Sequence, residues 1–272
     1  MDLYFYHHPQ VKLAYYKFGI GPKAMLCFHG YGMHGRQFSL LEKAYGQEYT
    51  FYSFDLFFHE QTELTCNSLD MVKKGLNKQL LSEIIEDFCA KNAILRFSMI
   101  AYSMGTHYAS TLLEHIPGRI DLFIAIAPSF LKPARILTLL GQNKLANKVL
   151  ERLIFSQSGL ENLLKLSKRL GMVDKKGFEI LAKEIATSAL RYNFYACITY
   201  LRFLSLDSKK FIEKANYEKI RIIFIFGSTD TGYPSTMNDG VLEALDHSEK
   251  LIVSGGHELI NSKLPEILGP YL

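Results

Sequence analysis

The sequence has few cysteines, and no two of them form a motif. Cys27, Cys66, Cys89 and Cys197 are far apart, and there is no Cys-x-x-Cys pair. Redox centres and zinc sites usually carry cysteines at such close spacing. Cys27 and Cys89 stand among apolar neighbours, as buried thiols commonly do. We therefore interpret the four cysteines as reduced and structural.

The sequence also lacks a long apolar run. No stretch reaches the roughly 20 apolar residues that a membrane-spanning helix needs. The N-terminal residues MDLYFYHHPQ have neither the basic start nor the apolar run of a secretory signal. These absences predict a cytoplasmic protein without a membrane span.

Neither sign of charge dominates. The 31 Lys and Arg residues nearly balance the 27 Asp and Glu residues, and the basic residues are spread out rather than gathered into a stripe. Because nucleic-acid binders usually carry a concentrated basic surface, nucleic acid is not expected as a partner. With 19 Gly and 8 Pro in 272 residues, the composition is that of a folded globular protein.

What the sequence does have is an alternation of short apolar runs and helical patterns. Segments 2–8 and 11–19 alternate in strand fashion and predict an N-terminal hairpin of two edge strands. Continuous apolar runs follow at 24–28, 49–58, 94–102, 121–127, 220–226 and 250–253. Strands that are apolar on both faces suit a parallel sheet covered by helices, and segments 77–91 and 104–115 have helical periodicity. We therefore predict an α/β fold with a mostly parallel eight-stranded sheet flanked by helices.

The alternation breaks between about Phe130 and Tyr217. This segment has no convincing strand, but it has helix-like stretches at 145–155, 159–170 and 175–205. We predict that residues 130–217 form a helical cap inserted into a core domain of residues 1–129 and 218–272.

One predicted strand runs directly into a serine that begins a helix. Segment 94–102 ends in Ala101-Tyr102-Ser103-Met104-Gly105, which is the layout of a nucleophile elbow. The backbone of such a serine is strained, so the residues two before and two after it must be small. The free N–H groups at a helix start favour negative charge, so the Met104 N–H is predicted to be one oxyanion donor. The alternative is that Ser103 merely caps a helix.

The first buried strand ends in His29-Gly30-Tyr31-Gly32, which resembles the His-Gly-x turn of α/β hydrolases. In that family the residue after His-Gly donates the second N–H of the oxyanion hole, so the resemblance assigns this role to Tyr31. His29 is expected to hold a loop by hydrogen bonds rather than to transfer protons. The elbow departs from the family in one place, because Ala101 replaces a glycine.

Two later strand ends resemble the segments that carry the acid and the base of this family. Gly227, Asp230 and Pro234 match its Gly-x-x-Asp-x-x-x-Pro pattern, and Gly256-His257 resembles the segment that presents the catalytic histidine. Carboxyl ends of parallel strands are also where such a fold builds its site.

The resemblance therefore assigns Ser103 as nucleophile, His257 as general base and Asp230 as the acid that orients the histidine. The order Ser, Asp, His along the chain is the one this fold requires. An imidazole must take the serine proton, and a carboxylate stabilises the imidazolium that forms. Taken singly, Asp230 is also a plausible turn residue and His257 a plausible loop histidine. Asp239 is the nearest rival acid.

A further segment both resembles and departs from the family. The family's Asp-Leu-Pro-Gly-His-Gly-x-Ser loop is matched by Asp55, Leu56 and His59, and Thr62 replaces the serine, but Phe57, Phe58 and Glu60 occupy the Pro, Gly and Gly places. The loss of both glycines removes easy positive-φ positions, so the motif does not predict the path of the loop. Adjacent residues such as His59 and Glu60 do not face one ion, and we predict neither a metal nor a cofactor.

Within the family, an aspartate at the nucleophile position implies dehalogenase or epoxide hydrolase chemistry. Ser103 indicates cleavage of an ester, thioester, amide or activated carbon–carbon bond instead. We predict a serine hydrolase that cleaves a small ester or related acyl compound through an acyl-enzyme intermediate. The alternatives are an acyltransferase, a carbon–carbon bond hydrolase, or a cofactor-free lyase or peroxidase on the same triad, and a non-catalytic receptor, whose usual mark is an eroded triad.

The segment 130–217 is expected to decide specificity for a small-molecule substrate with an apolar acyl group. Its apolar and aromatic residues form either a roof for that group or the core of the cap: Phe155, Leu163, Leu164, Phe194, Tyr195, Tyr200 and Phe203. Arg191 and Arg202 either meet a substrate carboxylate or are solvated. The sequence does not indicate an oligomeric state.

Overall fold

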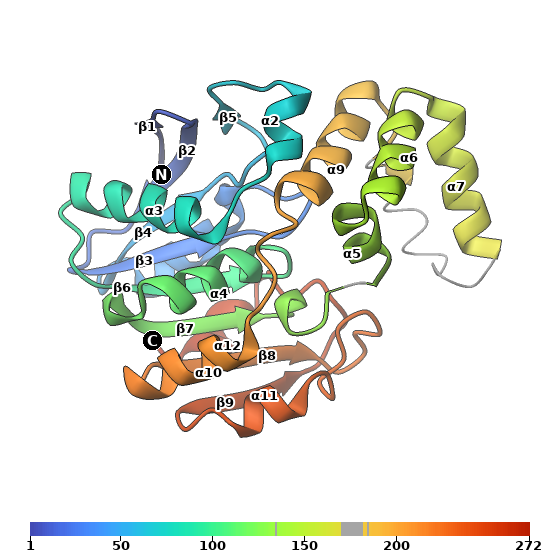
Figure 1. The fold of residues 1–272 in the computed structure, drawn as a ribbon. Helices are drawn as coiled ribbons and strands as arrows, with labels where there is room; N and C mark the ends of the chain where they lie inside the picture. The colour runs from blue at the N-terminus through green and yellow to red at the C-terminus, as the bar shows by residue number, and fades with distance from the viewer. Residues whose placement is uncertain (134, 170–181, 184) are drawn as a thin grey trace. The chain divides into compact units, whose positions relative to one another are not determined.

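A computed structural model describes residues 1–133, 135–169, 182–183 and 185–272, and only the backbone of Gln157 and Leu163. The chain divides into two compact units (Figure 1). The first unit comprises Met1–Cys66, Asn77–Pro133 and Leu204–Leu272, and the second comprises Asn67–Leu76 and Ala134–Phe203.

These boundaries differ from the predicted domains in the placement of two helices and of residues 130–133, which belong to the first unit. Helix α10 (Ser208–Tyr217) belongs to the first unit, because it packs against α4 (Gly105–His115) and buries Phe211 and Ala215. Helix α2 (Leu69–Lys74) belongs to the second unit, because it packs against α9 (Ser188–Tyr200). Each unit is therefore assembled from segments that are distant in sequence.

The first unit is built on a nine-stranded sheet. Its strands are β1 (Asp2–His8), β2 (Val11–Phe18), β3 (Lys23–Phe28), β4 (Tyr49–Phe54), β5 (Glu63–Leu64), β6 (Phe97–Tyr102), β7 (Ile120–Ile126), β8 (Arg221–Gly227) and β9 (Ser248–Val253). The order across the sheet is β1-β2-β4-β3-β6-β7-β8-β9, and β5 pairs with β2 off this path. The predicted eight strands thus become nine, because the two residues of β5 are too few to leave a periodic pattern.

The sheet is mostly parallel, as predicted. Strands β4, β3, β6, β7, β8 and β9 run parallel, whereas β1 pairs antiparallel with β2, and β2 antiparallel with β4. The N-terminal hairpin is confirmed, with His8 opposite Val11 across its turn. The expectation of two edge strands is wrong for β2, because β2 lies between β1 and β4.

Helices cover both faces of this sheet (Figure 1). On one face α4 packs on β3, β6 and β7, with α3 (Lys78–Lys91) and α10 beside it. On the other face lie the 3-10 helix η1 (Gly35–Leu41), α1 (Glu42–Tyr45) and α12 (Leu264–Leu268). Shorter elements of the same unit are η2 (Pro117–Arg119), η3 (Ser129–Leu131) and α11 (Asp239–Glu243).

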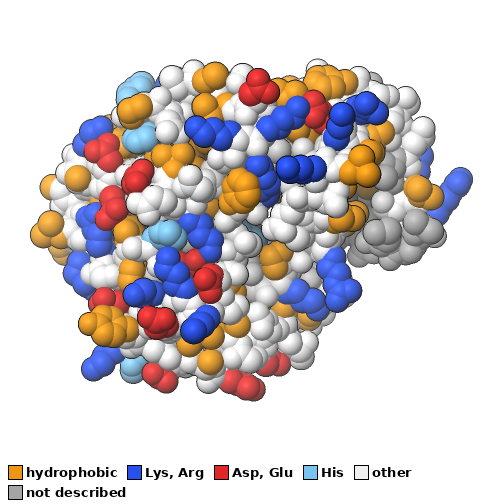
Figure 2. Space-filling model, in the orientation of Figure 1, with side chains coloured by type: hydrophobic (Ala, Val, Ile, Leu, Met, Phe, Trp, Pro, Cys, Tyr) orange, Lys and Arg blue, Asp and Glu red, His pale blue; other side chains and the backbone are white. Residues whose placement is uncertain are grey.

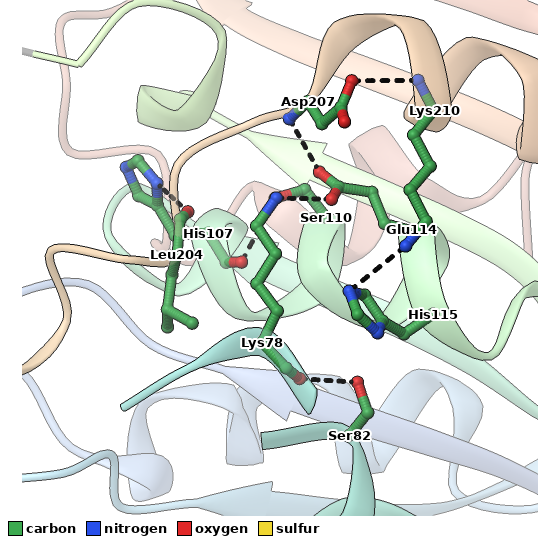
Figure 3. Close-up of polar contacts among 9 residues, drawn as sticks. All are labelled: Lys78, Ser82, His107, Ser110, Glu114, His115, Leu204, Asp207 and Lys210. Atoms are coloured by element: carbon green, nitrogen blue, oxygen red, sulfur yellow. Dashed lines mark hydrogen bonds and ion pairs between the residues drawn. The ribbon is translucent and has the colours of Figure 1, made fainter. Parts of the chain in front are cut away.

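A buried ion pair ties α3 to α4 in the first unit (Figure 3). The Lys78 ammonium pairs with the Glu114 carboxylate, whose side chain is 1% exposed. The other Glu114 oxygen accepts the Asp207 N–H at 3.0 Å, and His107 Nδ1 donates to the Leu204 carbonyl at 3.1 Å. Leu204 and Asp207, at the start of the last segment of the first unit, are therefore hydrogen-bonded to α4.

Among the described residues of the second unit, every regular element is a helix. Besides α2 and α9 it contains α5 (Arg135–Gln142), α6 (Lys144–Ile154) and α7 (Gln157–Arg169). Helices α6 and α7 lie where helices were predicted at 145–155 and 159–170. The predicted helix 175–205 falls partly outside the described residues, and α9 ends at Tyr200. In the part of the chain that the structure describes, no helix has the length and apolar character needed to cross a bilayer.

Charged side chains of both signs lie intermingled over the first unit on the face drawn in Figure 2. Its exposed ion pairs include Arg96 with Asp121 at 2.6 Å and Arg221 with Glu249 at 2.7 Å. Exposed pairs of this kind contribute at most about 1 kcal/mol each to stability. The stability of this unit therefore rests on its buried core.

Candidate active site

The residues predicted for the site follow four different strands of the parallel sheet. Tyr31 comes after β3, Ser103 directly after β6, Asp230 after β8 and His257 after β9. Because parallel strands end at the same edge of a sheet, these four segments converge there. The structure brings Ser103 and Asp230 each within hydrogen-bond distance of His257.

His257 bridges the serine and the aspartate. Its Nε2 lies 2.9 Å from Ser103 Oγ, and its Nδ1 lies 2.7 Å from Asp230 Oδ2. With a proton on Nδ1 that is donated to the carboxylate, Nε2 is free to accept the serine hydroxyl proton. This arrangement can turn a weakly nucleophilic hydroxyl into an attacking alkoxide.

Asp230 is buried and fully engaged. Its Oδ1 accepts the N–H groups of Gly232 and Tyr233, each at 3.0 Å, while Oδ2 faces His257. Burial alone raises the pKa of this carboxyl, but the hydrogen bonds from His257 and the two backbone N–H groups outweigh burial and lower the pKa. Asp230 is therefore held as a carboxylate beside the imidazole.

The backbone at Ser103 has the strained geometry expected of an elbow. Its φ is +47°, in the left-handed region that side chains other than glycine seldom adopt. The small residues around it are required, since a Cβ on Gly105 would lie 2.2 Å from the Phe28 carbonyl oxygen. Ala101 is fully buried on the strand side. Ser103 thus lies at a sharp turn between the end of β6 and the start of α4.

The carbonyl oxygen of Ser103 anchors this strained turn. It accepts the Thr106 N–H at 3.0 Å, the Thr106 hydroxyl, and the Ser129 hydroxyl at 2.8 Å. Ser129 comes just after β7. No sequence pattern indicated this use of the serine, because the bond joins segments that follow two different strands.

The Gly30 turn passes directly beside the nucleophile candidate. A Cβ on Gly30 would lie 3.4 Å from Ser103 Cβ, so Tyr31 follows a residue that adjoins the serine. Met104 is the N-cap of α4 and follows Ser103 in the chain. The two predicted oxyanion donors therefore belong to segments that meet at one serine, and their role stays a prediction.

His29 is buried and holds two loops together, as expected. Its Nδ1 donates to the Gly30 carbonyl at 2.7 Å, and its Nε2 accepts the Leu56 N–H at 2.9 Å. Burial, reinforced by the neighbouring His59, lowers the pKa of His29 well below its usual value. His29 is therefore a neutral side chain that links the turn at Gly30 to the loop at Leu56.

His59 holds the other side of the same turn. Its Nε2 accepts the Gly32 N–H at 3.0 Å, its Nδ1 donates to the Phe57 carbonyl at 2.9 Å, and its ring meets that of Tyr31 edge-on at 5.4 Å. Burial lowers the pKa of His59. The match of His59 to the family loop was the signal for this role, which sequence reasoning did not assign.

The loop around His59 keeps left-handed positions at Phe58 and Glu60 although neither is glycine. Phe58 has φ +63° and Glu60 has φ +44°, and these are the two places where the family has glycine. Each such residue costs about 1–2 kcal/mol of backbone strain. Phe57 is buried in the first unit and stacks on Tyr108 with ring centroids 6.2 Å apart.

The aromatic residues predicted in the cap divide between core and surface. Tyr195 and Tyr200 are buried, whereas Phe155 is 73% exposed. The Leu163 side chain lies outside the described residues. Arg191 is buried rather than solvated, and its Nε donates to the Ile154 carbonyl at 3.0 Å, at the end of α6.

Arg202 also serves the structure of the second unit. Its guanidinium donates to the Lys73 carbonyl at 2.5 Å and to the Thr199 carbonyl, and it lies over the Phe203 ring. Among the described residues, no three His, Cys, Asp or Glu side chains gather into a metal-binding group.

Comparison with known proteins gives matches in structure alone. No family model matches the sequence, and no curated protein has significant sequence similarity to it. A Pseudomonas aeruginosa protein assigned as an epoxide hydrolase superposes with a TM-score of 0.65 at 17% identity, over 100% of this chain and 95% of its own. The chain has the α/β-hydrolase fold.

Other structures with the α/β-hydrolase fold also match over nearly all of this chain. A carboxylesterase from Bacillus subtilis has a TM-score of 0.61 at 12% identity and covers 99% of this chain and 89% of its own. The thioesterase domain of the curacin biosynthetic pathway has a TM-score of 0.63 at 15% identity and covers 98% of this chain and 99% of its own. The contact of Ser103, His257 and Asp230 lies at the carboxyl edge of the sheet, where this fold builds its sites.

Proposed function

We propose that this chain is a serine hydrolase that cleaves a small ester or related acyl compound through an acyl-enzyme intermediate. The observation that carries the proposal is the chain of contacts from Ser103 Oγ to His257 Nε2 at 2.9 Å and from His257 Nδ1 to Asp230 Oδ2 at 2.7 Å. Both separations are within hydrogen-bond reach, which is the geometric requirement for a nucleophile and its base.

The proposed reaction begins with proton transfer. His257 Nε2 takes the Ser103 hydroxyl proton as Oγ attacks the substrate carbonyl carbon, and the carbonyl π electrons move to the oxygen. Asp230 stabilises the imidazolium without itself accepting the proton. When the tetrahedral intermediate collapses, the bond to the leaving oxygen breaks, and His257 gives that oxygen its proton.

The second half returns the enzyme to its starting state. A water molecule gives a proton to His257 and attacks the acyl carbon, and the Ser103 ester bond then breaks as Oγ regains a proton. In both halves the negative oxygen would accept the N–H groups of Tyr31 and Met104. Loss of one oxyanion donor typically lowers turnover about 10²- to 10³-fold.

Serine chemistry is favoured over epoxide opening by the residue at the elbow itself. Ser103 occupies the position where epoxide hydrolases of this fold carry an aspartate. An ester is the simplest substrate of such a serine, and a thioesterase and a carboxylesterase are among the structural neighbours. An apolar acyl group remains our proposal for the substrate.

The test is covalent labelling combined with turnover. We expect a fluorophosphonate probe to label the wild-type protein and short p-nitrophenyl esters to be hydrolysed, and Ser103→Ala to abolish both. Ser228→Ala is the matched control, because Ser228 is an exposed serine that follows β8 in the same unit. Equal labelling of Ser103→Ala and wild type would refute the assignment.

The same assay separates the competing functions. If an added alcohol captures the acyl group faster than water does, the chain is an acyltransferase. If the wild type is neither labelled nor active on esters of any acyl length, the hydrolase proposal is wrong and a non-catalytic receptor gains support.

A further inference from the structure

Tyr102 precedes Ser103, and its side chain reaches the segment that carries the histidine. Its hydroxyl donates to the His257 carbonyl oxygen at 3.0 Å, across 155 residues of sequence. The two rings also meet, with centroids 5.3 Å apart and planes inclined at 36°. The tyrosine is 5% exposed, whereas the His257 side chain is partly exposed, so both contacts lie where the buried tyrosine meets the edge of the site.

The same ring lies against the Gly30 turn. A Cβ on Gly30 would fall 2.8 Å from two carbons of the Tyr102 ring, so glycine at position 30 permits this close packing. The backbone of Tyr102 belongs to β6, where it lies opposite Ile126 of β7. One rigid side chain thus touches the turn that leads to Tyr31 and the segment that carries His257.

The segment that carries His257 has no regular secondary structure of its own. It is an irregular stretch after β9 in which Gly255 has φ +141°, a conformation that side chains rarely adopt. The His257 carbonyl accepts the Leu259 N–H at 2.9 Å in addition to the Tyr102 hydroxyl. The tyrosine bond ties this carbonyl to β6, the strand that ends at the nucleophile.

We propose that Tyr102 is a positioning residue that sets the separation between Ser103 and His257 and supports the oxyanion turn at Gly30. This inference rests on the proposed hydrolase function. The aromatic ring acts as a spacer of constant length, and its hydroxyl bond determines where the backbone of the base lies. Burial raises the pKa of Tyr102, so the hydroxyl remains a donor throughout the pH range of an esterase assay.

Tyr102→Phe is the decisive variant, because it removes the hydroxyl and keeps the ring that packs on Gly30. One hydrogen bond of this kind contributes enough to lower kcat about 3- to 10-fold when it acts on the transition state. We expect kcat and the rate of Ser103 phosphonylation to fall together while KM stays within about twofold of wild type. Tyr102→Leu also removes the ring, and we expect it to lower kcat about 100-fold.

Tyr45→Phe is the matched control. The Tyr45 hydroxyl likewise donates to a backbone carbonyl, that of Pro265, but it touches neither Ser103 nor His257. Both variants should lower the midpoint of urea unfolding by a similar amount, whereas only Tyr102→Phe should lower kcat.

Wild-type kcat in Tyr102→Phe, a loss confined to KM, or an equal loss of kcat in Tyr45→Phe would overturn the positioning role. A failure of the hydrolase proposal is recognised separately. If labelling and turnover do not depend on Ser103, the proposed hydrolase function is wrong, and the positioning role of Tyr102 is then also refuted.

Discussion

The Ser129 hydroxyl donates to the carbonyl oxygen of Ser103 at 2.8 Å and so joins the end of β7 to the strained turn after β6. The turn is strained because Ser103 has φ +47°, and such backbone persists only when neighbouring groups hold it. Ser129 is 4% exposed, so water does not readily replace this bond. The contact therefore helps to hold the strained backbone at Ser103.

Ser129→Ala is expected to lower kcat about 3- to 10-fold and the free energy of unfolding by about 1 kcal/mol, because one buried hydrogen bond at the elbow is lost. Steady-state ester hydrolysis and urea unfolding measure the two effects. Ser110→Ala is the control, since the Ser110 hydroxyl donates to the His107 carbonyl within α4. A loss of kcat in Ser110→Ala as large as in Ser129→Ala would contradict this explanation.

Asp230→Asn is expected to lower turnover about 10⁴-fold while the protein still folds, because an amide does not favour the histidine tautomer that the reaction needs. Asp239→Asn is the comparison. The Asp239 carboxylate pairs with Lys250 at 2.8 Å on the surface, and its loss should leave kcat within about twofold of wild type. A mild loss of turnover in Asp230→Asn with a severe loss in Asp239→Asn would reassign the acid to Asp239.

Gly105→Ala is expected to lower the free energy of unfolding by about 1–3 kcal/mol and kcat by at least about tenfold. The added Cβ would lie 2.2 Å from the Phe28 carbonyl, so β3 and the start of α4 must separate. Gly240→Ala in α11 is the control, because a Cβ there meets nothing within 4 Å. That variant should be neutral or more stable by about 0.5–1 kcal/mol. Equal unfolding midpoints for the two variants would refute the argument from close approach.

Acid should destabilise the fold through its buried histidines before its carboxylates titrate. Burial, together with the nearby Lys78, lowers the pKa of His107 to about 4, although its bond to Leu204 opposes the shift (Figure 3). Below the unfolded pKa of about 6.5, the unfolded chain binds a proton that the folded chain does not. As the pH is lowered from about 6.5 toward the folded pKa, the free energy of unfolding therefore decreases. The decrease is up to about 1.4 kcal/mol per pH unit for each such histidine.

The measurement is urea unfolding between about pH 7.5 and 5, with His107→Gln as the variant. The glutamine side chain does not titrate. We therefore expect the slope of the free energy of unfolding against pH to decrease by an amount that corresponds to about one proton. His29 and His59 shift in the same direction and remain in the variant, so part of the slope persists. An unchanged slope in His107→Gln would show that His107 does not carry this effect.

The sequence by itself determined the α/β architecture and the segments of the candidate site. Buried parallel strands read as continuous apolar runs, and a site at their carboxyl ends draws on residues that directly follow such runs. Ser103, Asp230 and His257 were predicted without a structure because their segments follow such runs and resemble the motifs of the family. The two residues of β5 are too few to form such a run.

The tertiary structure decided which residues hold that site in place. The bonds of Ser129 to Ser103, of His59 to Gly32 and of Tyr102 to His257 join segments 26, 27 and 155 residues apart. A pattern in sequence records the local period of a helix or strand, whereas these bonds depend on how strands are ordered and where their ends meet. Folding brought these pairs within 3.0 Å, and no local signal specifies that distance.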